Sequence, residues 1–377
     1  MAPLSADPSI GRLASSILTK NLRVKAGERV TIEGWPHTLP LAVALAREAR
    51  HLRALPMVLY EDEAAYWDVI SKGGAAVLGT LPGHEWAALA ETDVYIHMWG
   101  PGDRVRLAAL PPKEAGSLFK FNDAWYTAAR KAGLRGLRLE MGRPYPTLAT
   151  AYGVDERVWT NQLVAASLVE PTVLAGRASA VTRPLRSGKR LRITHPNGTD
   201  LTLGLAHRPV RVYDGRPTVG DRGRPFDILA NLPSGAMRVS LDETVAEGTL
   251  VGNRTCYYED GVARGPTFQF SRGKLTRARF ASGGERFDQP FAKGGQGRDR
   301  PGFLAVGFNP ELHDTPQLED LEAGAVMVSV GGNRHLGGRN ESPFFGWAVI
   351  AGASLAVDGQ PISLPGGSDG RGRGDDR

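Results

Sequence analysis

The stretch Leu22-Arg-Val-Lys-Ala-Gly-Glu-Arg-Val-Thr-Ile32 sets the pattern for the first half of the chain. Ala26-Gly27 introduces the short β-branched segment Glu28-Arg-Val-Thr-Ile-Glu33, which predicts a strand. Before this strand, Ile10 to Leu22 carries apolar residues at helical spacing, and after it Leu39 to Ala49 repeats that period. The chain therefore begins with a helix, a strand and a second helix.

The same alternation continues through the first half of the sequence. Further strands are expected at Pro56–Tyr60, Asp93–Met98 and Leu137–Glu140, with helices at Glu63–Ser71 and Asp123–Ala132. Alternation of this kind indicates an α/β N-terminal domain with an open, largely parallel sheet. A long amphipathic stretch, from about Asp155 to Leu174, predicts a single helix that leads out of this domain.

The second half of the chain changes character. Lys189–Thr194 and Asp200–Leu205 alternate as strands do, and the turn-rich His195-Pro-Asn-Gly-Thr199 between them predicts a hairpin. Short strands separated by glycine-rich turns follow, at Thr267–Phe270, Leu275–Phe280, Phe303–Gly307 and Ala325–Val330. We therefore expect an α/β domain over residues 1–175, a β-rich α+β domain over 176–365, and a polar, glycine-rich disordered tail over 366–377.

Composition narrows the classes of function. The 377 residues are 41% hydrophobic, enough for two domains with ample cores. The net charge of +6 comes from scattered arginines among 40 acidic residues, which argues against nucleic acid and for mild attraction to an acidic partner. Cys256 is the only cysteine, so an internal disulfide is excluded.

The chain also lacks signals for membranes. No apolar run approaches the ~20 residues that span a bilayer. The opening Met1-Ala-Pro-Leu-Ser-Ala-Asp-Pro8 lacks the basic and apolar regions of a signal peptide. We expect a soluble, cytoplasmic protein without a membrane partner.

Several segments taken together resemble the M29 aminopeptidase family and the related dioxygenases that act on dihydroxypyridine. Besides the opening stretch, they are Gly198-Thr-Asp-Leu201, Asn231-Leu-Pro-Ser-Gly235, Val245-Ala-Glu-Gly248, Val306-Gly-Phe-Asn-Pro310 and Gly331-Gly-Asn-Arg-His-Leu-Gly-Gly-Arg-Asn-Glu-Ser342. Their order and spacing cover most of the chain. The resemblance implies an M29-type fold, with a β-rich C-terminal domain, and a homodimer.

The resemblance also implies a metal site that this sequence does not reproduce. The family's chemistry needs carboxylates and imidazoles around divalent metals. The corresponding positions here are Ala236, Phe303, Met327, Phe345 and Trp347, and the family's catalytic tyrosine aligns with Arg334. Only Met327 carries a possible donor, a soft thioether. We therefore expect a divergent member without metal, cofactor or catalytic residues.

The replacements share an apolar character. They would fill the former metal cavity with aromatic surface, which either packs shut as ordinary core or leaves an apolar pocket. Segments bordering the implied cleft carry groups that could hydrogen-bond an extended peptide or its carboxylate, at Asn231, Arg254, Arg334, His335 and Asn340. Together with Phe303, Phe345 and Trp347, these are the candidate peptide-binding residues.

Other catalytic arrangements are weakly supported. The eight histidines include no His-x-x-x-His pair, and no Gly-x-Ser-x-Gly elbow is present. His313-Asp314 precedes the acidic stretch Glu319-Asp320-Leu321-Glu322, which could form a replacement metal site. We interpret this stretch as a solvated loop, because charged residues and prolines are typical of loops.

The leading hypothesis is thus a catalytically inactive M29-like protein that binds a peptide. Its ligand would be a precursor or leader peptide in the biosynthesis of a bacterial ribosomal peptide natural product, held for a partner enzyme. Two alternatives stay open. One is an enzyme, either metal-free and working through His335 and Arg334 or carrying a relocated metal. The other is a structural subunit paired with an active homologue.

Overall fold

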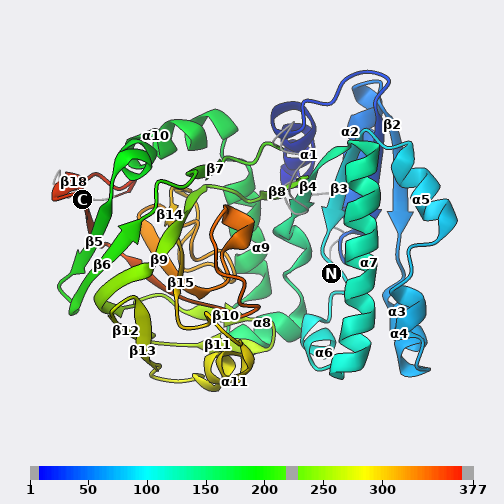
Figure 1. Cartoon of the computed structure of the whole chain (residues 1–377). Coiled ribbons are helices and arrows are strands. Elements are labelled where there is room, and N and C mark those ends of the chain that lie inside the picture. The colour runs from blue at the N-terminus through cyan, green and yellow to red at the C-terminus, as the bar shows by residue number, and fades with distance from the viewer. Residues whose placement is uncertain (1–7, 218–227, 367–377) are drawn as a thin grey trace, which may run out of the picture. The chain divides into compact units, whose positions relative to one another are not determined.

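The computed structural model describes residues 8–217 and 228–366. The chain forms two compact units (Figure 1). Unit 1 comprises Met1–Pro171, Tyr213–Ser234 and Glu259–Gly261, and unit 2 comprises Thr172–Val212, Gly235–Tyr258 and Val262–Arg377. This division differs from the single boundary expected near residue 175, because the chain returns to unit 1 after residue 212. The expected tail lies, beyond Gly366, outside the described residues.

Unit 1 is built on a parallel sheet, as the alternating sequence pattern predicts. Its strand order is β2-β1-β3-β4-β8, and each neighbouring pair is parallel. The strands are β1 (Arg29–Gly34), β2 (Leu55–Tyr60), β3 (Val94–Met98), β4 (Arg135–Leu139) and β8 (Leu229–Leu232). Strand β8 comes from the segment expected in the β-rich domain, and it is held in unit 1 by burial of Leu229 and Leu232.

Helices cover both faces of this sheet. On one face, helices α1 and α2 pack on a cluster that includes Val30, Ile32 and Ile96, and on the other α5 and α7 pack around Tyr95. The helical segments are α1 (Pro8–Ser16), η2 (Ile17–Asn21), α2 (Leu39–His51), α3 (Glu63–Ser71), α4 (Ala75–Leu78), α5 (Gly83–Ala90), α6 (Arg104–Ala108), α7 (Pro112–Ala132), η3 (Glu140–Gly142), α8 (Pro146–Tyr152) and α9 (Glu156–Ser167).

Two helices differ from the expected bounds. Helix α7 runs from Pro112, well before the expected start at Asp123. The expected single helix over Asp155–Leu174 is instead α9, followed after a break by α10 (Pro171–Ser187). Pro171 supplies the physical reason, because proline disfavours helical conformation in the residue before it and favours the start of a new helix.

Unit 2 is dominated by an antiparallel sheet with the strand order β16-β15-β14-β9-β6-β5-β17-β18, to which β12, β13 and β7 are attached. The strands are β5 (Arg190–His195), β6 (Thr199–Leu205), β7 (Arg211–Tyr213), β9 (Ala236–Val251), β12 (Thr267–Ser271), β13 (Lys274–Arg279), β14 (Pro301–Gly307), β15 (Ala325–Gly331), β16 (Phe345–Ala351), β17 (Ser354–Val357) and β18 (Gln360–Ile362). The short pair β10 (Cys256–Tyr258) and β11 (Gly261–Ala263) stands apart, and α11 (Glu285–Lys293) and η4 (Arg334–Leu336) complete the elements.

Strand β9 organises this sheet, since it pairs with β14, β6 and β12 along its 16 residues. At Gly248 the backbone has a φ of +115°, and a Cβ there would lie 2.1 Å from the carbonyl oxygen of Asp200. Only glycine allows this close approach of β6. The expected hairpin is confirmed, because β5 and β6 pair antiparallel across the predicted turn.

The structure thus confirms the expected fold class, an α/β unit with a parallel sheet and a β-rich antiparallel unit. Within residues 8–217 and 228–366, no helix has both the length and the apolar character that crossing a membrane requires.

Candidate functional site

Four strands of unit 2 bring the aligned metal-site positions to one face of the sheet. Opposite residues of an antiparallel pair share a face, as do residues two apart along a strand. The pairs Phe303–Ser240, Ala305–Met327, Ser329–Trp347 and Gly331–Phe345 fix the register. The residues placed on this common face are Ala236, Phe303, Met327, Phe345 and Trp347.

The inner part of this face is closed by packing. Ala236, Phe303 and Met327 are 0%, 4% and 6% exposed. Phe303 and Met327 belong to one apolar cluster, against which the half-buried Trp347 packs. Of the two expected outcomes, core packing therefore describes this inner part.

An aromatic row runs from this packed part outward, and is defined as Tyr258, Trp347, Phe345 and the buried Phe303. Ring centroids lie 4.9 Å apart for Tyr258 and Trp347, 5.1 Å for Trp347 and Phe345, and 5.5 Å for Phe345 and Phe303. Phe345 is nearly parallel to both of its neighbours, with interplanar angles of 6° and 19°, and it is 41% exposed. The stacked rings therefore leave apolar surface exposed to solvent at Phe345.

A pocket adjoins the row at its exposed member, Phe345. It is a shallow, open depression of about 410 Å³, lined by Pro290, Lys293, Gly294, Pro343, Phe344 and Phe345. Behind it, Phe344 packs edge-on against Phe287 and Phe291, with centroids 5.2 and 5.3 Å away. The pocket therefore has a firm apolar wall and a single charged lining residue, Lys293.

A buried carboxyl group forms a hydrogen bond with one member of the row, Trp347. Glu319 is 2% exposed, and its Oε1 accepts a 2.7 Å hydrogen bond from Nε1 of Trp347. Its Oε2 has no hydrogen-bond partner among the described residues. Burial raises the pKa of Glu319 to about 8, so the group is mainly protonated at neutral pH.

The rest of the acidic stretch is also buried, and the expectation of a solvated loop is wrong. Asp320 forms a 2.8 Å ion pair with Arg238, and Glu322 accepts hydrogen bonds of 2.7 and 2.6 Å from Arg254. Guanidinium partners far away in the sequence neutralise these carboxylates. Asp320 and Glu322 are therefore structural ion-pair partners.

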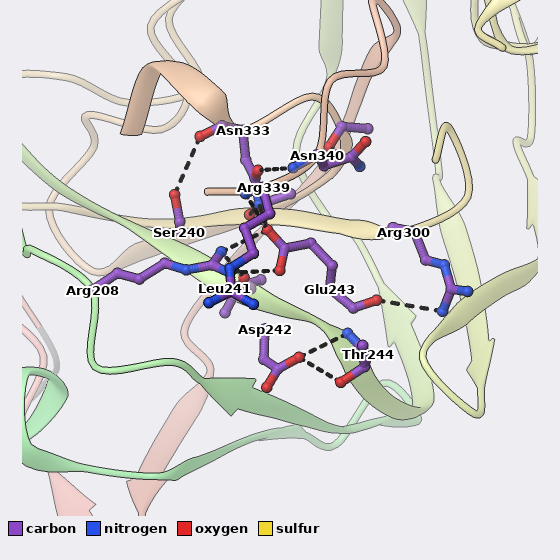
Figure 2. A network of polar contacts seen from close by, with 12 residues as sticks. Arg208, Ser240, Leu241, Asp242, Glu243, Thr244, Arg300, Asn333, Arg339 and Asn340 are labelled. Atoms are coloured by element: carbon purple, nitrogen blue, oxygen red, sulfur yellow. Dashed lines mark hydrogen bonds and ion pairs between the residues drawn. The ribbon is translucent and has the colours of Figure 1, made fainter. Parts of the chain in front are cut away.

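A polar network around Glu243 fixes the loop that follows β15 (Figure 2). The Glu243 carboxylate accepts hydrogen bonds from Arg208 at 2.7 and 2.6 Å, from the Arg339 backbone at 2.7 Å and from Nδ2 of Asn333 at 2.9 Å. Burial alone would raise the pKa of Glu243, but these donors, led by Arg208, lower it to about 2. The carboxylate is thus ionised and anchors residues 333–340.

The predicted polar residues do not all meet at the row. The His335 ring contacts Phe303 edge-on, with centroids 5.7 Å apart, and the exposed Arg334 pairs with Glu341 at 2.6 Å. Asn340 is buried within its loop, where Nδ2 donates to the carbonyls of residues 297 and 331. Arg254 is held by Glu322, and the exposed Asn231 belongs to β8 of unit 1.

Sequence reasoning missed Tyr258 and Arg238, and it placed Glu319 in a solvated loop. No local pattern marks Tyr258, which joins the row only through tertiary contact with Trp347. Arg238 lies two residues after Ala236 on β9, so its place on the same face could have been inferred from strand alternation. Its guanidinium lies 5.8 Å from the Phe303 ring.

The residues at the implied metal position do not fit such a centre. Two divalent ions would need several carboxylate or imidazole ligands, whereas alanine, phenylalanine, methionine and tryptophan stand there. In the part of the chain that the structure describes, no group of three or more His, Cys, Asp or Glu side chains is arranged to hold a metal ion.

The overall fold is aminopeptidase-like. The chain is similar to the structure of wild-type AmpT from Thermus thermophilus, an M29 aminopeptidase, with a TM-score of 0.69 and 20% identity over 95% of this chain and 98% of that one. It is also similar to 2,5-dihydroxypyridine dioxygenase from Pseudomonas putida KT2440, with a TM-score of 0.59 and 15% identity over 94% and 95%. No protein-family model and no curated protein sequence matches the chain. Identities this low support a shared fold alone.

Proposed function

We propose that this chain is a catalytically inactive protein of aminopeptidase-like fold that binds a peptide on the aromatic row of unit 2. The observation that carries the proposal is the row itself. Phe345 is 41% exposed, stacks on Phe303 and Trp347, and borders a pocket of about 410 Å³. Apolar recesses beside exposed aromatic side chains are typical of ligand sites.

A peptide side chain would supply the apolar half of the interaction. Burying one leucine or phenylalanine side chain in such a pocket contributes about 1.5 to 3 kcal/mol. Phe345 and the wall residue Phe344 would contact it, and the exposed Lys293 would attract a carboxylate of the same peptide. The net charge of +6 would likewise attract acidic peptides to the protein.

The absence of catalysis is proposed from the chemistry of the same face. The implied ligand positions carry apolar side chains, and the nearby Asp320 and Glu322 are engaged with Arg238 and Arg254. Glu319 is mainly protonated at neutral pH and buried beneath Trp347. These groups supply neither a metal cage nor a nucleophile.

A protein that binds a peptide without hydrolysing it suits a role in peptide biosynthesis. We propose a precursor or leader peptide of a ribosomal peptide natural product as the ligand, presented to a partner biosynthetic enzyme. A homodimer, implied by the resemblance to the M29 family, belongs to the same proposal. Light scattering on the purified chain checks that state, and a monomer at all concentrations would contradict it.

Replacing Phe345 with alanine is expected to weaken peptide binding about tenfold or more, because it removes the exposed ring and one pocket wall. Calorimetric titration with acidic ten-residue peptides, each carrying a single phenylalanine or leucine, measures the effect. The same peptides with alanine at that position should bind weakly.

Phe119→Ala is the matched control. Phe119 is another exposed ring, 65% accessible, on α7 of unit 1. Its loss should leave the affinity unchanged. Equal affinities for the two variants, or no binding of any peptide at about 1 mM, would refute the proposal.

Purified protein is expected to hold far less than one divalent metal ion per chain, even after exposure to zinc, manganese and cobalt salts. The reason is the lack of hard donors at Ala236, Phe303 and Trp347. Elemental analysis after dialysis checks this. Stoichiometric metal would instead favour the alternative of an enzyme with a relocated metal.

A further inference from the structure

The parallel sheet of unit 1 has a switch point that the proposed function does not use. In the order β2-β1-β3-β4-β8, the chain moves outward from β1 to β2 and then crosses back to β3. The switch therefore lies between β1 and β3. In open α/β sheets, ligands bind outside the carboxyl ends of the strands at this point.

Polar side chains bridge the two strands at their carboxyl ends. Glu33 near the end of β1 accepts a 2.7 Å hydrogen bond from Nδ1 of His97 near the end of β3. The hydroxyl of Tyr95 also donates to Glu33, at 3.0 Å, and so does Nε1 of Trp35, at 3.3 Å. The carboxylate is thus occupied, while Nε2 of His97 has no hydrogen-bond partner among the described residues.

Trp99 continues from β3 into the same region. Its ring lies 5.5 Å from that of His97, and the guanidinium groups of Arg104, Arg138 and Arg143 lie 5.1, 5.1 and 4.1 Å from the indole centroid. The indole Nε1 is buried, and within the described residues it donates no hydrogen bond.

Two of the three arginines are neutralised. Arg104 and Arg143 share the carboxylate of Glu259, at 3.2 and 3.3 Å, and Arg143 also pairs with Glu140. Arg138 differs, because no carboxylate of the described chain pairs with it. Its Nη2 donates to the hydroxyl of Tyr126, and its Nε is buried without a partner.

Arg138 stands beside His97 in the sheet. The two residues are opposite each other in the parallel pair of β3 and β4, so their side chains leave the same face. A half-buried guanidinium without a counter-charge is costly unless an anion accompanies it. Arg138 and Trp99 therefore offer unused donors, and His97 offers a ring nitrogen next to them.

We propose that the switch point of unit 1 binds a small organic or inorganic oxyanion, a carboxylate or a phosphate, between Arg138, Trp99 and His97. The planar guanidinium matches two oxygens of such a group, and the indole N–H supplies a further donor. Because Nδ1 of His97 is engaged with Glu33, Nε2 is the ring nitrogen left to hydrogen-bond a ligand. A ligand carrying a hydroxyl beside the anion, such as a 2-hydroxycarboxylate or hydrogen phosphate, satisfies all three groups.

Titration of the full chain with lactate, hydrogen phosphate, acetate and chloride at constant ionic strength tests this inference. The indole N–H resonance of Trp99, assigned from its loss in Trp99→Phe, is expected to shift with lactate or phosphate at a dissociation constant of about 1 mM or tighter. Acetate lacks the hydroxyl and should bind more weakly. Saturation by lactate alone or by phosphate alone decides which source of oxyanion the site accepts.

Arg138→Gln should weaken binding at least tenfold, whereas Arg157→Gln, which removes the same charge from an exposed position on α9, should not. Arg138→Lys keeps the positive charge but loses the planar guanidinium, and it should also weaken binding. Because it preserves the charge inside the fold, it controls for a folding defect in Arg138→Gln. Overturning results are the absence of any shift specific to lactate or phosphate, or equal binding by Arg138→Gln and wild type.

Discussion

The unfolding free energy of the wild-type chain is expected to fall by about 3 to 5 kcal/mol between about pH 5 and pH 9 because of Glu319. In Glu319→Gln this fall should be absent. Burial raises the pKa of Glu319 from 4.5 to about 8 in the folded state. Between these values the folded protein binds more protons at this site than the unfolded chain does. Stability contributed by the site is therefore present at low pH and lost as the pH rises through 8.

Chemical denaturation of both proteins across this pH range measures the effect. The quantity of interest is the difference in unfolding free energy between wild type and variant, since other titrating groups cancel in it. Glu311→Gln, at an exposed position of the same region, is the control and should show no such difference. A difference that does not change with pH would mean that Glu319 is ionised when folded.

Glu243→Gln is expected to destabilise the protein by about 3 kcal/mol, near the lower end of the cost of breaking a buried ion pair from one side, because the pair is partly buried. Arg208 would lose the carboxylate to which both its Nη atoms donate, and Nη1 would keep only the Leu241 carbonyl. The backbone N–H of Arg339 and the amide of Asn333 would face a weaker acceptor. Figure 2 shows how these donors converge on the one carboxylate.

The sign of the pH dependence is opposite to that of Glu319. The pKa of Glu243 falls from 4.5 to about 2 on folding, so its stabilisation is present above 4.5 and is lost as the pH falls toward 2. Denaturant titration should find that wild type and Glu243→Gln converge in stability over this range. Glu247→Gln, at an exposed site on the same strand, should cost less than about 1 kcal/mol. An equal cost for both variants would contradict the anchoring role of Glu243.

Local periodicity was sufficient to predict much of the fold. The helical spacing of Leu39–Ala49 and the β-branched run at Glu28–Glu33 are set by neighbours in sequence, and α2 and β1 follow them closely. Strand β8 was not predictable in this way. Its four residues are too short for a pattern, and its place beside β4 depends on burial of Leu229 against the helices of unit 1.

The candidate site was predictable to the extent that it depends on strand register. Phe303, Phe345 and Trp347 lie on strands whose motifs fix their alignment, and their rings do stack. The acidic stretch was misinterpreted because the charges of Asp320 and Glu322 suggest solvent when their partners are unknown. Arg238 and Arg254 are 82 and 68 residues away, a separation that no sequence pattern bridges.

The central claim is that this fold binds a peptide without using a metal. It is tested most directly by calorimetric titration of a phenylalanine-bearing acidic peptide into the full chain in excess EDTA, with the mass of the peptide measured afterwards. We predict unchanged affinity in EDTA and an intact peptide. Binding that requires added zinc, manganese or cobalt, or recovery of a peptide shortened from its N-terminus, would contradict the claim.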